Sequence, residues 1–273
     1  MKKYFVCSDI HSFYNEWRDA LDKQGFEIDN KNHIICICGD LFDRGLQSKE
    51  CLQFAKDMKD QGRLIYVRGN HEDLLFDCYY QIIQGKNIDS HHNSNGTIDT
   101  ICQLSDTNKY DVYIGIDKTS NIAKVKEALE PVLDFITDTC VDYYEFERYI
   151  LVHGYIPTIS ERDIPAYWRK GRGYAYNKDW RNGDLYDWEL ARWVNGVELA
   201  EKYKIYEPGK QIVVGHWHCS YGWSWIKQER KEFPEKNRRD WQKSFEIFET
   251  ERVIAIDSCC AYTGFINCYV IEE

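Results

Sequence analysis

Three short apolar runs near the start of this chain each lead directly into a cluster of metal-binding and phosphate-binding residue types. The runs are Tyr4–Cys7, Ile34–Cys38 and Leu64–Val67. The clusters that follow them are Asp9-Ile10-His11, Gly39-Asp40-Leu41-Phe42-Asp43-Arg44-Gly45 and Arg68-Gly69-Asn70-His71-Glu72. Runs this short, rich in β-branched and aromatic residues, predict buried strands. Because ligands of open α/β sheets gather beyond the carboxyl ends of strands, the three clusters predict one polynuclear metal site.

The same pattern recurs further along the chain. Tyr149–Val152 leads into His153, and Gln211–Val214 leads into Gly215-His216-Trp217-His218. Five of the eight histidines therefore follow predicted strands: His11, His71, His153, His216 and His218. The other three, His33, His91 and His92, do not. A single histidine is more often structural than a ligand, but five in matching positions favour a metal site.

The motif order D-x-H, GD-x-x-DRG, RGNHE, HG and GH, which spans Asp9 to His218, resembles that of the calcineurin-like metallophosphoesterases. Its DRG and RGNHE forms are similar to the branch that holds phosphoprotein phosphatases and symmetrical diadenosine-tetraphosphate hydrolases. Ala255-Ile256-Asp257-Ser258, followed by Gly264, resembles the IDTG-type strand and turn near the end of bacterial members.

The resemblance implies an α/β fold in which two mixed β-sheets pack face to face with flanking helices, the metallophosphoesterase four-layer sandwich. It implies a single catalytic domain over residues 1–273, with insertions at about 85–130 and 156–199. From the residues alone, alternating strand and helix patterns predict only the α/β class.

By the same resemblance, the chain is a metal-dependent phosphatase or phosphoesterase with two divalent metal ions. Mn²⁺ is the expected ion, and Fe, Zn or Co also suit nitrogen and oxygen ligands. A hydroxide that bridges the two ions would attack phosphorus. The implied ligands are Asp9 and His11 for the first ion, Asp40 as the bridge, and Asn70, His153 and His216 for the second ion.

His71 is expected to be the general acid that protonates the leaving group. Asp43 would accept a hydrogen bond from its other ring nitrogen and raise its pKa. Arg44 would bind phosphate with its planar guanidinium group. The expected substrate-binding residues are Arg44, Asn70, Arg68 and Arg192. Two simpler interpretations remain: Asp43-Arg44-Gly45 as a polar turn, and Arg68 as the partner of an acidic neighbour.

Two departures from the family pattern bear on the site. The glycines usual around D-x-H are replaced in Ser8-Asp9-Ile10-His11-Ser12, which restricts the backbone there. In addition, His218 follows His216 by two residues. On extended chain these two side chains would point the same way, which would make His218 a further ligand to the first ion. The alternative is a polar loop histidine beside Trp217.

The substrate is less constrained than the reaction. Between Ile156 and Leu199 the chain interleaves aromatic residues with arginines, which suits base stacking or binding of a phosphorylated peptide. A small cap held by aromatic packing is the alternative. The leading expectation is a serine/threonine-type protein phosphatase. The second is a hydrolase of dinucleoside polyphosphates or other nucleotides, and the third is a degenerate member that only binds a phosphorylated partner.

Composition narrows the partners and the location. The 35 basic and 45 acidic residues give a net charge of −10, which argues against a nucleic-acid groove. We find no apolar run of about 18 residues and no signal-like start, so no membrane association is expected. The eleven cysteines are odd in number and scattered, which favours reduced thiols and a cytoplasmic location.

Between the motifs, apolar periodicity predicts four helices, over Phe13–Lys23, Leu46–Lys59, His71–Ile83 and Asn121–Leu133. Two polar stretches, Gln84–Tyr110 and Gln228–Asp240, are expected to be loops.

Overall fold

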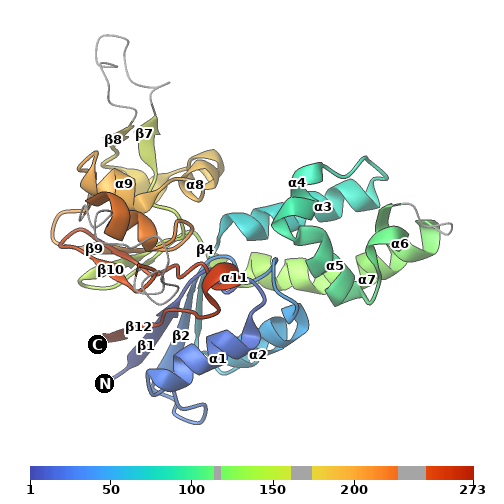
Figure 1. Ribbon diagram of the computed structural model, residues 1–273, viewed down its shortest axis with the longest axis horizontal. Helices are drawn as coiled ribbons and strands as arrows, with labels where there is room; N and C mark the ends of the chain where they lie inside the picture. Colours follow the sequence, from blue (N-terminus) through green and yellow to red (C-terminus); the bar gives the residue numbers. More distant parts are fainter. Residues whose placement is uncertain (114–117, 161–173, 227–243) are drawn as a thin grey trace, which may run out of the picture.

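A computed structural model describes residues 1–113, 118–160, 174–226 and 244–273, and shows an α/β fold (Figure 1). Its first sheet has the order β12 (Tyr269–Glu272), β1 (Lys3–Cys7), β2 (His33–Cys38), β3 (Leu64–Val67) and β4 (Cys140–Val141). Strands β1 to β4 are parallel, and β12 pairs with β1 in the antiparallel sense.

The second sheet has the order β10 (Phe248–Glu249), β11 (Val253–Ala255), β9 (Gln211–Val214), β6 (Tyr149–Leu151) and β5 (Tyr144–Glu145). Its central strands β11, β9 and β6 are parallel, and its outer strands are antiparallel. A separate hairpin joins β7 (Thr158–Ser160) to β8 (Tyr174–Tyr176). The predicted pair of mixed sheets is therefore confirmed.

Alternation along the strands divides the interior into three layers. On β1, Tyr4 and Val6 pack against Leu151 and Val213 of the second sheet. Phe5, by contrast, belongs to the core that joins the first sheet to its helices. Successive side chains of a strand point to opposite faces, so one buried strand serves both layers. This is the packing of a four-layer sandwich.

Helices cover the outer face of each sheet. On the first sheet lie α1 (Tyr14–Lys23) and α2 (Ser48–Asp60). The helices α3 (Asn70–Ile83) and α7 (Lys118–Thr139) pack against each other and extend to one side of this sheet (Figure 1). All four confirm predicted helices. On the second sheet lie α8 (Leu185–Ala191), α9 (Gly196–Glu201) and a 3₁₀ turn at Trp180–Asn182. The remaining short elements are α11 (Cys260–Thr263) and a π-helical segment at Gly222–Ile226.

The loop expected over Gln84–Tyr110 is wrong. This stretch contains α4 (Ser90–Asn95), α5 (Thr97–Ser105) and the start of α6 (Lys109–Tyr113), which join α3 and α7 in one helical group (Figure 1). Polar composition hid a short apolar stripe on α5, where Ile98, Ile101 and Leu104 are spaced three residues apart and buried. The other expected loop, Gln228–Asp240, lies outside the described residues.

The described part of the 156–199 insertion is held by packing. Trp180 and Trp188 are buried, and the ring of Tyr143 stacks on Trp188. Arg181 pairs with Glu145 at 2.6 Å and with Glu207 at 3.0 Å. These contacts match the aromatic-cap interpretation for this part. Residues 161–173 lie outside the described residues. They carry Tyr167, Trp168 and four cationic residues of the insertion, Arg162, Arg169, Lys170 and Arg172.

Two further sequence expectations can be compared with the structure. All eleven cysteines are free, and eight of them are buried. Across the described ranges, no helix combines the length and the apolar character needed to cross a bilayer.

The packing of α5 makes a prediction about stability. Ile101→Ala removes a side chain with no solvent exposure and should lower the free energy of unfolding by about 2–5 kcal/mol. The matched control is Leu46→Ala, because Leu46 is 81% exposed and its loss should cost within about 0.5 kcal/mol. Urea denaturation followed by circular dichroism measures both. Equal midpoints for the two variants would contradict the buried position of α5.

Candidate metal centre

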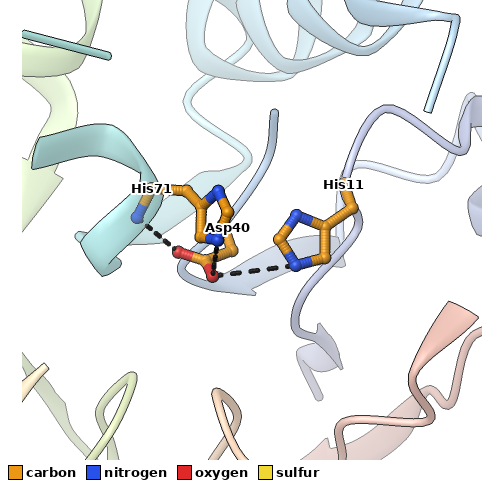
Figure 2. A group of neighbouring side chains, drawn as sticks. All are labelled: His11, Asp40 and His71. Carbon is orange, nitrogen blue, oxygen red and sulfur yellow. Dashed lines mark hydrogen bonds and ion pairs between the residues drawn. The ribbon is translucent and has the colours of Figure 1, made fainter. Parts of the chain in front are cut away.

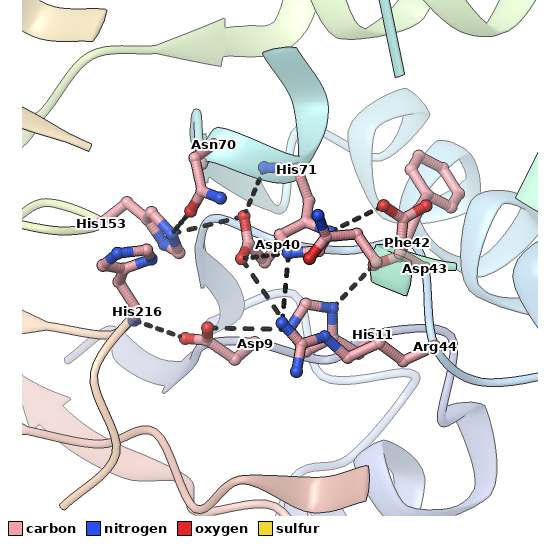
Figure 3. Close-up of polar contacts among 12 residues, drawn as sticks. Asp9, His11, Asp40, Phe42, Asp43, Arg44, Asn70, His71, His153 and His216 are labelled. Carbon is pink, nitrogen blue, oxygen red and sulfur yellow. Dashed lines mark hydrogen bonds and ion pairs between the residues drawn. The ribbon is translucent and has the colours of Figure 1, made fainter. Parts of the chain in front are cut away.

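Six polar residues follow the carboxyl ends of six strands, three from each sheet. After β1, β2 and β3 come Asp9, Asp40 and Asn70, and after β6, β9 and β11 come His153, His216 and Asp257. All except the partly exposed His216 are buried. The first five of these converge with His11, His71, Asp43 and Arg44 in one group (Figure 3).

Asp40 lies at the centre of this group. Its Oδ2 atom is 3.8 Å from His11 Nε2 and 3.8 Å from His71 Nε2 (Figure 2). Its Oδ1 atom is 3.3 Å from His153 Nε2. Donor atoms of His11, Asp40 and His71 all lie within 4.8 Å of one another, and so do those of Asp40, His153 and His216. One carboxylate shared by two such groups has the geometry that a bridge between two cations requires.

The tautomers of two histidines are fixed by backbone carbonyls. His11 donates from Nδ1 to the Phe42 carbonyl at 2.9 Å, and His216 donates from Nε2 to the Trp193 carbonyl at 3.1 Å. Burial lowers the pKa of His11 well below its usual value and that of His216 to about 3, so both rings are neutral. A neutral imidazole with its second nitrogen free of a proton is the form that binds metals.

His153 shows that this site favours positive charge. Its Nδ1 faces the Cys38 carbonyl at 2.8 Å, and its Nε2 faces Asn70 Oδ1 at 2.8 Å as well as Asp40. Because both nitrogens face acceptor atoms, this arrangement favours a positively charged ring. Burial lowers the pKa of His153, but the carboxylate of Asp40 outweighs burial and raises it to about 10. A metal ion bound to Nε2 would supply the same charge.

Two buried carboxylates, Asp9 and Asp257, also indicate that the site favours a bound cation. Burial raises the pKa of Asp9 well above its usual value, and the charge of Asp257 raises it further. Burial and the charge of Asp40 likewise raise the pKa of Asp257. Like charges in a buried site oppose ionisation unless a cation lies between them. The donor set therefore fits one or two divalent cations.

The loops that carry these residues adopt backbone conformations uncommon for L-residues. Among the described residues, ten that are not glycine have positive φ, and eight of them lie in these loops: Asp9, His11, Ser12, Asp40, Asp43, Arg44, His216 and Cys259. Each costs about 1–3 kcal/mol, and such residues cluster at functional sites. Ser12 adopts φ 59°, a conformation that glycine reaches with less strain.

Sequence reasoning missed the role of Glu72. Its buried carboxylate accepts hydrogen bonds from the backbone N–H groups of Asp40, Leu41 and Gly69 at 3.0, 3.0 and 2.7 Å. It also accepts one from the Tyr66 hydroxyl at 2.7 Å. The loop after β2 is thereby tied to the start of α3. The pattern gave a hint, since Glu72 completes the RGNHE motif.

The three residues expected to act on the leaving group lie together. His71 Nδ1 donates to Asp43 Oδ2 at 2.6 Å, and Arg44 Nη2 lies 3.4 Å from His71 Nε2. Thr97 and Thr100 donate to the two oxygens of Asp43 at 2.8 and 2.7 Å. Burial lowers the pKa of His71, but Asp40 and Asp43 together outweigh it and raise the pKa above its usual value.

The other two arginines expected to bind substrate, Arg68 and Arg192, form ion pairs with acidic residues. Arg68 donates to Asp73 at 2.7 Å, and the buried Arg192 donates to Asp73 at 2.9 Å and to Asp142 at 2.5 Å. The metal-centre cleft described below is lined by neither of them, as far as the described residues show. Arg68 therefore pairs with an acidic neighbour, as the simpler interpretation of this residue predicted.

His218 lines the cleft, but the reasoning that led to it is wrong in one respect. The backbone at His216 is left-handed, with φ 61°, and not extended. His218 Nδ1 is 2.7 Å from Ser220 Oγ, and its ring lies 5.5 Å from that of Phe245. Its part in metal binding stays a prediction.

A cavity of about 320 Å³ opens over the centre. Its lining includes Arg44, the metal-binding candidates other than His153, and also Trp193, Trp217, Asn95 and Cys259. Trp193 is 46% exposed. The sequence pattern singled out Trp193 only as one aromatic residue among many, and Asn95 not at all, because neither follows a strand.

Comparisons with known proteins identify a family and several relatives with similar sequences. Residues 2–255 match the family model described as calcineurin-like phosphoesterase. The chain is 30% identical over 115 residues to the asymmetrical bis(5′-nucleosyl)-tetraphosphatase PrpE of Bacillus subtilis, covering 40% of this chain and 46% of that protein. It is 37% identical over 86 residues to the symmetrical bis(5′-nucleosyl)-tetraphosphatase of Buchnera aphidicola, covering 32% and 30%.

The chain thus spans about half of the first relative and less of the second. Among solved structures, a cold-active protein-tyrosine phosphatase of a psychrophilic Shewanella aligns over 100% of this chain and 76% of its own, with 18% identity and a TM-score of 0.48.

The four hydrogen bonds to Glu72 make a prediction about the centre. Glu72→Gln leaves one acceptor oxygen and turns an amide N–H₂ toward backbone donors, so it should cost about 1–3 kcal/mol and weaken metal binding through Asp40. Tyr66→Phe, which removes a single donor, should cost about 0.5–1.5 kcal/mol. Urea denaturation and metal titration measure both effects. A Glu72→Gln protein with the stability and metal affinity of the parent would refute the role given to this carboxylate.

Proposed function

The chain belongs to the calcineurin-like phosphoesterase family, and on that premise we propose that it is a phosphoester hydrolase that cleaves dinucleoside polyphosphates. Two groups of relatives support the substrate class, since both are named as bis(5′-nucleosyl)-tetraphosphatases. They favour the nucleotide alternative over the serine/threonine protein phosphatase that the motifs first suggested.

One observation on the cleft carries the proposal. Trp193 and Trp217 line the same cavity as Arg44 and the metal-binding candidates other than His153. Aromatic faces stack nucleobases, and a guanidinium group binds phosphate oxygens through charge-assisted hydrogen bonds. A nucleotide carries both a base that can stack on the tryptophans and a phosphate that can bind Arg44, whereas a phosphoserine side chain carries only the phosphate.

We assign the ligands as the motifs imply. Asp9, His11 and Asp40 would hold one divalent cation, and Asp40, Asn70, His153 and His216 would hold the other. His218 is a candidate for the first ion. When bound, the two cations would lower the pKa of a water molecule and offset the charge of the phosphate. Mn²⁺ is the proposed ion, with Fe, Zn or Co as alternatives.

The protein side chains then have separate tasks. Arg44 and Asn70 would orient the phosphoryl oxygens. His71 would donate its Nε2 proton to the leaving oxygen while Asp43 accepts the hydrogen bond from Nδ1. Thr97 and Thr100 hold Asp43, so the ring of His71 is fixed before substrate binds.

We also propose a cytoplasmic location, because all eleven cysteines are free thiols. Such thiols persist in a reducing compartment.

The substrate proposal predicts the outcome of a parallel assay. With Mn²⁺, the protein should cleave diadenosine tetraphosphate with a higher kcat/KM than a phosphoserine peptide. Trp193→Ala should raise KM for the dinucleotide by about 5–150-fold, the loss of one stacked base, and leave p-nitrophenyl phosphate hydrolysis unchanged. The matched control is Tyr186→Ala, an exposed aromatic residue of α8 that does not line the cleft. A higher kcat/KM for the phosphopeptide would favour the protein phosphatase instead.

Mechanism is tested by two further substitutions. Asp40→Asn should lose bound metal and activity together, because it removes the proposed bridge. His71→Asn should retain metal and lower kcat on a phosphoserine peptide by about 10²–10⁴-fold. On diadenosine tetraphosphate its effect should be smaller, since a nucleoside polyphosphate leaves with less protonation than an alkoxide. Full activity of His71→Asn on the phosphopeptide would exclude His71 as the acid.

A further inference from the structure

We propose that Asp77, His91 and His92 form a further metal site, for a divalent transition-metal ion such as Zn²⁺. The site is separate from the strand-end centre and does not depend on the proposed function. It would join α3, which carries Asp77, to α4, which carries both histidines.

The donor geometry is the first observation. Donor atoms of the three residues all lie within 4.8 Å of one another. His92 Nε2 lies 3.0 Å from Asp77 Oδ2, and the rings of His91 and His92 have centroids 4.0 Å apart. Two imidazoles and one carboxylate are the ligand types that zinc takes in three-ligand protein sites, with water in the fourth position.

The second observation is the burial of His92. Its ring has no exposed surface and holds Nε2 beside Asp77. Its Nδ1 atom, on the far side of the ring, has no hydrogen-bond partner among the residues that the structure describes, so it can carry the ring proton while Nε2 binds an ion.

The surroundings hold the cluster in place and leave it accessible. Gln81 Nε2 donates to Asp77 Oδ2 at 3.0 Å and to Asp89 Oδ2 at 2.9 Å, and Gln81 Oε1 accepts from the Asp89 N–H at 2.8 Å. Outer hydrogen bonds of this kind orient metal ligands. Asp77 and His91 are exposed, so an ion can enter from solvent and keep a bound water there.

The position of α4 gives the site a consequence. The last residue of the helix, Asn95, lines the strand-end cleft, and Gly96, which caps the helix, packs against the backbone of Arg44. The next residue, Thr97, holds Asp43. An ion that fastens the start of α4 to α3 would therefore stabilise the segment that supports the phosphate-binding loop.

Zinc binding tests the proposal directly. The parent, His91→Ala, Asp77→Asn and the exposed control Ser90→Ala are each titrated with Zn²⁺, and bound zinc is measured by elemental analysis after dialysis. His91→Ala should bind one equivalent fewer than the parent and Ser90→Ala, and Asp77→Asn should bind that equivalent at least about tenfold more weakly. Both altered positions are exposed, so the fold should be retained.

A second measurement separates this site from the strand-end centre. In the Asp40→Asn background, Zn²⁺ should still raise Tm, and His91→Ala should abolish that rise while leaving Tm without zinc unchanged. His91→Ala and Asp77→Asn proteins that match Ser90→Ala in zinc equivalents, affinity and Tm shift would overturn the proposal.

Discussion

The negative charge of Asp40 is buried among three imidazoles, and the other features of the centre depend on how that charge is held. His153 and His71 lower its pKa well below the usual value despite burial. Glu72 accepts a hydrogen bond from the backbone N–H of Asp40 and so holds this loop in place. The carboxylate of Asp40 in turn accepts a hydrogen bond from the backbone N–H of His71 at 2.9 Å. Buried charges persist only when paired and hydrogen-bonded. The carboxylate therefore both orders the loops and marks the place where cations would bind.

The two sheets explain why these loops meet. Parallel strands put their carboxyl ends at one edge, and the face-to-face packing of the sheets brings two such edges together. Each loop then turns sharply, and several residues enter the left-handed region to aim their side chains inward. The strain is tolerated because the strands before these loops are fully buried, with no exposure at Val6, Ile37 or Ile150.

The sequence pattern identified most residues of the candidate metal centre, because these residues share one local feature: each follows a buried strand. That rule located Asp9, Asp40, Asn70, His153 and His216 without any knowledge of the fold. The rule gives no information where a residue's contacts are with distant partners. Arg192, expected to bind substrate, pairs with Asp73 and Asp142 in the structure. The helices between Gln84 and Tyr110 were missed because α4 is polar throughout and α5 is short.

By itself, then, the sequence determined the α/β class, the four longer helices and the residue types gathered at the strand ends. These follow from periodicity and from chain-local spacing, which are properties of neighbouring residues. Only the tertiary structure decided that Glu72 organises the loops, that Trp193 and Asn95 line the cleft, and that His91 and His92 meet Asp77. Those contacts join residues between 3 and more than 100 positions apart in the chain, and no local pattern specifies which of them fold together.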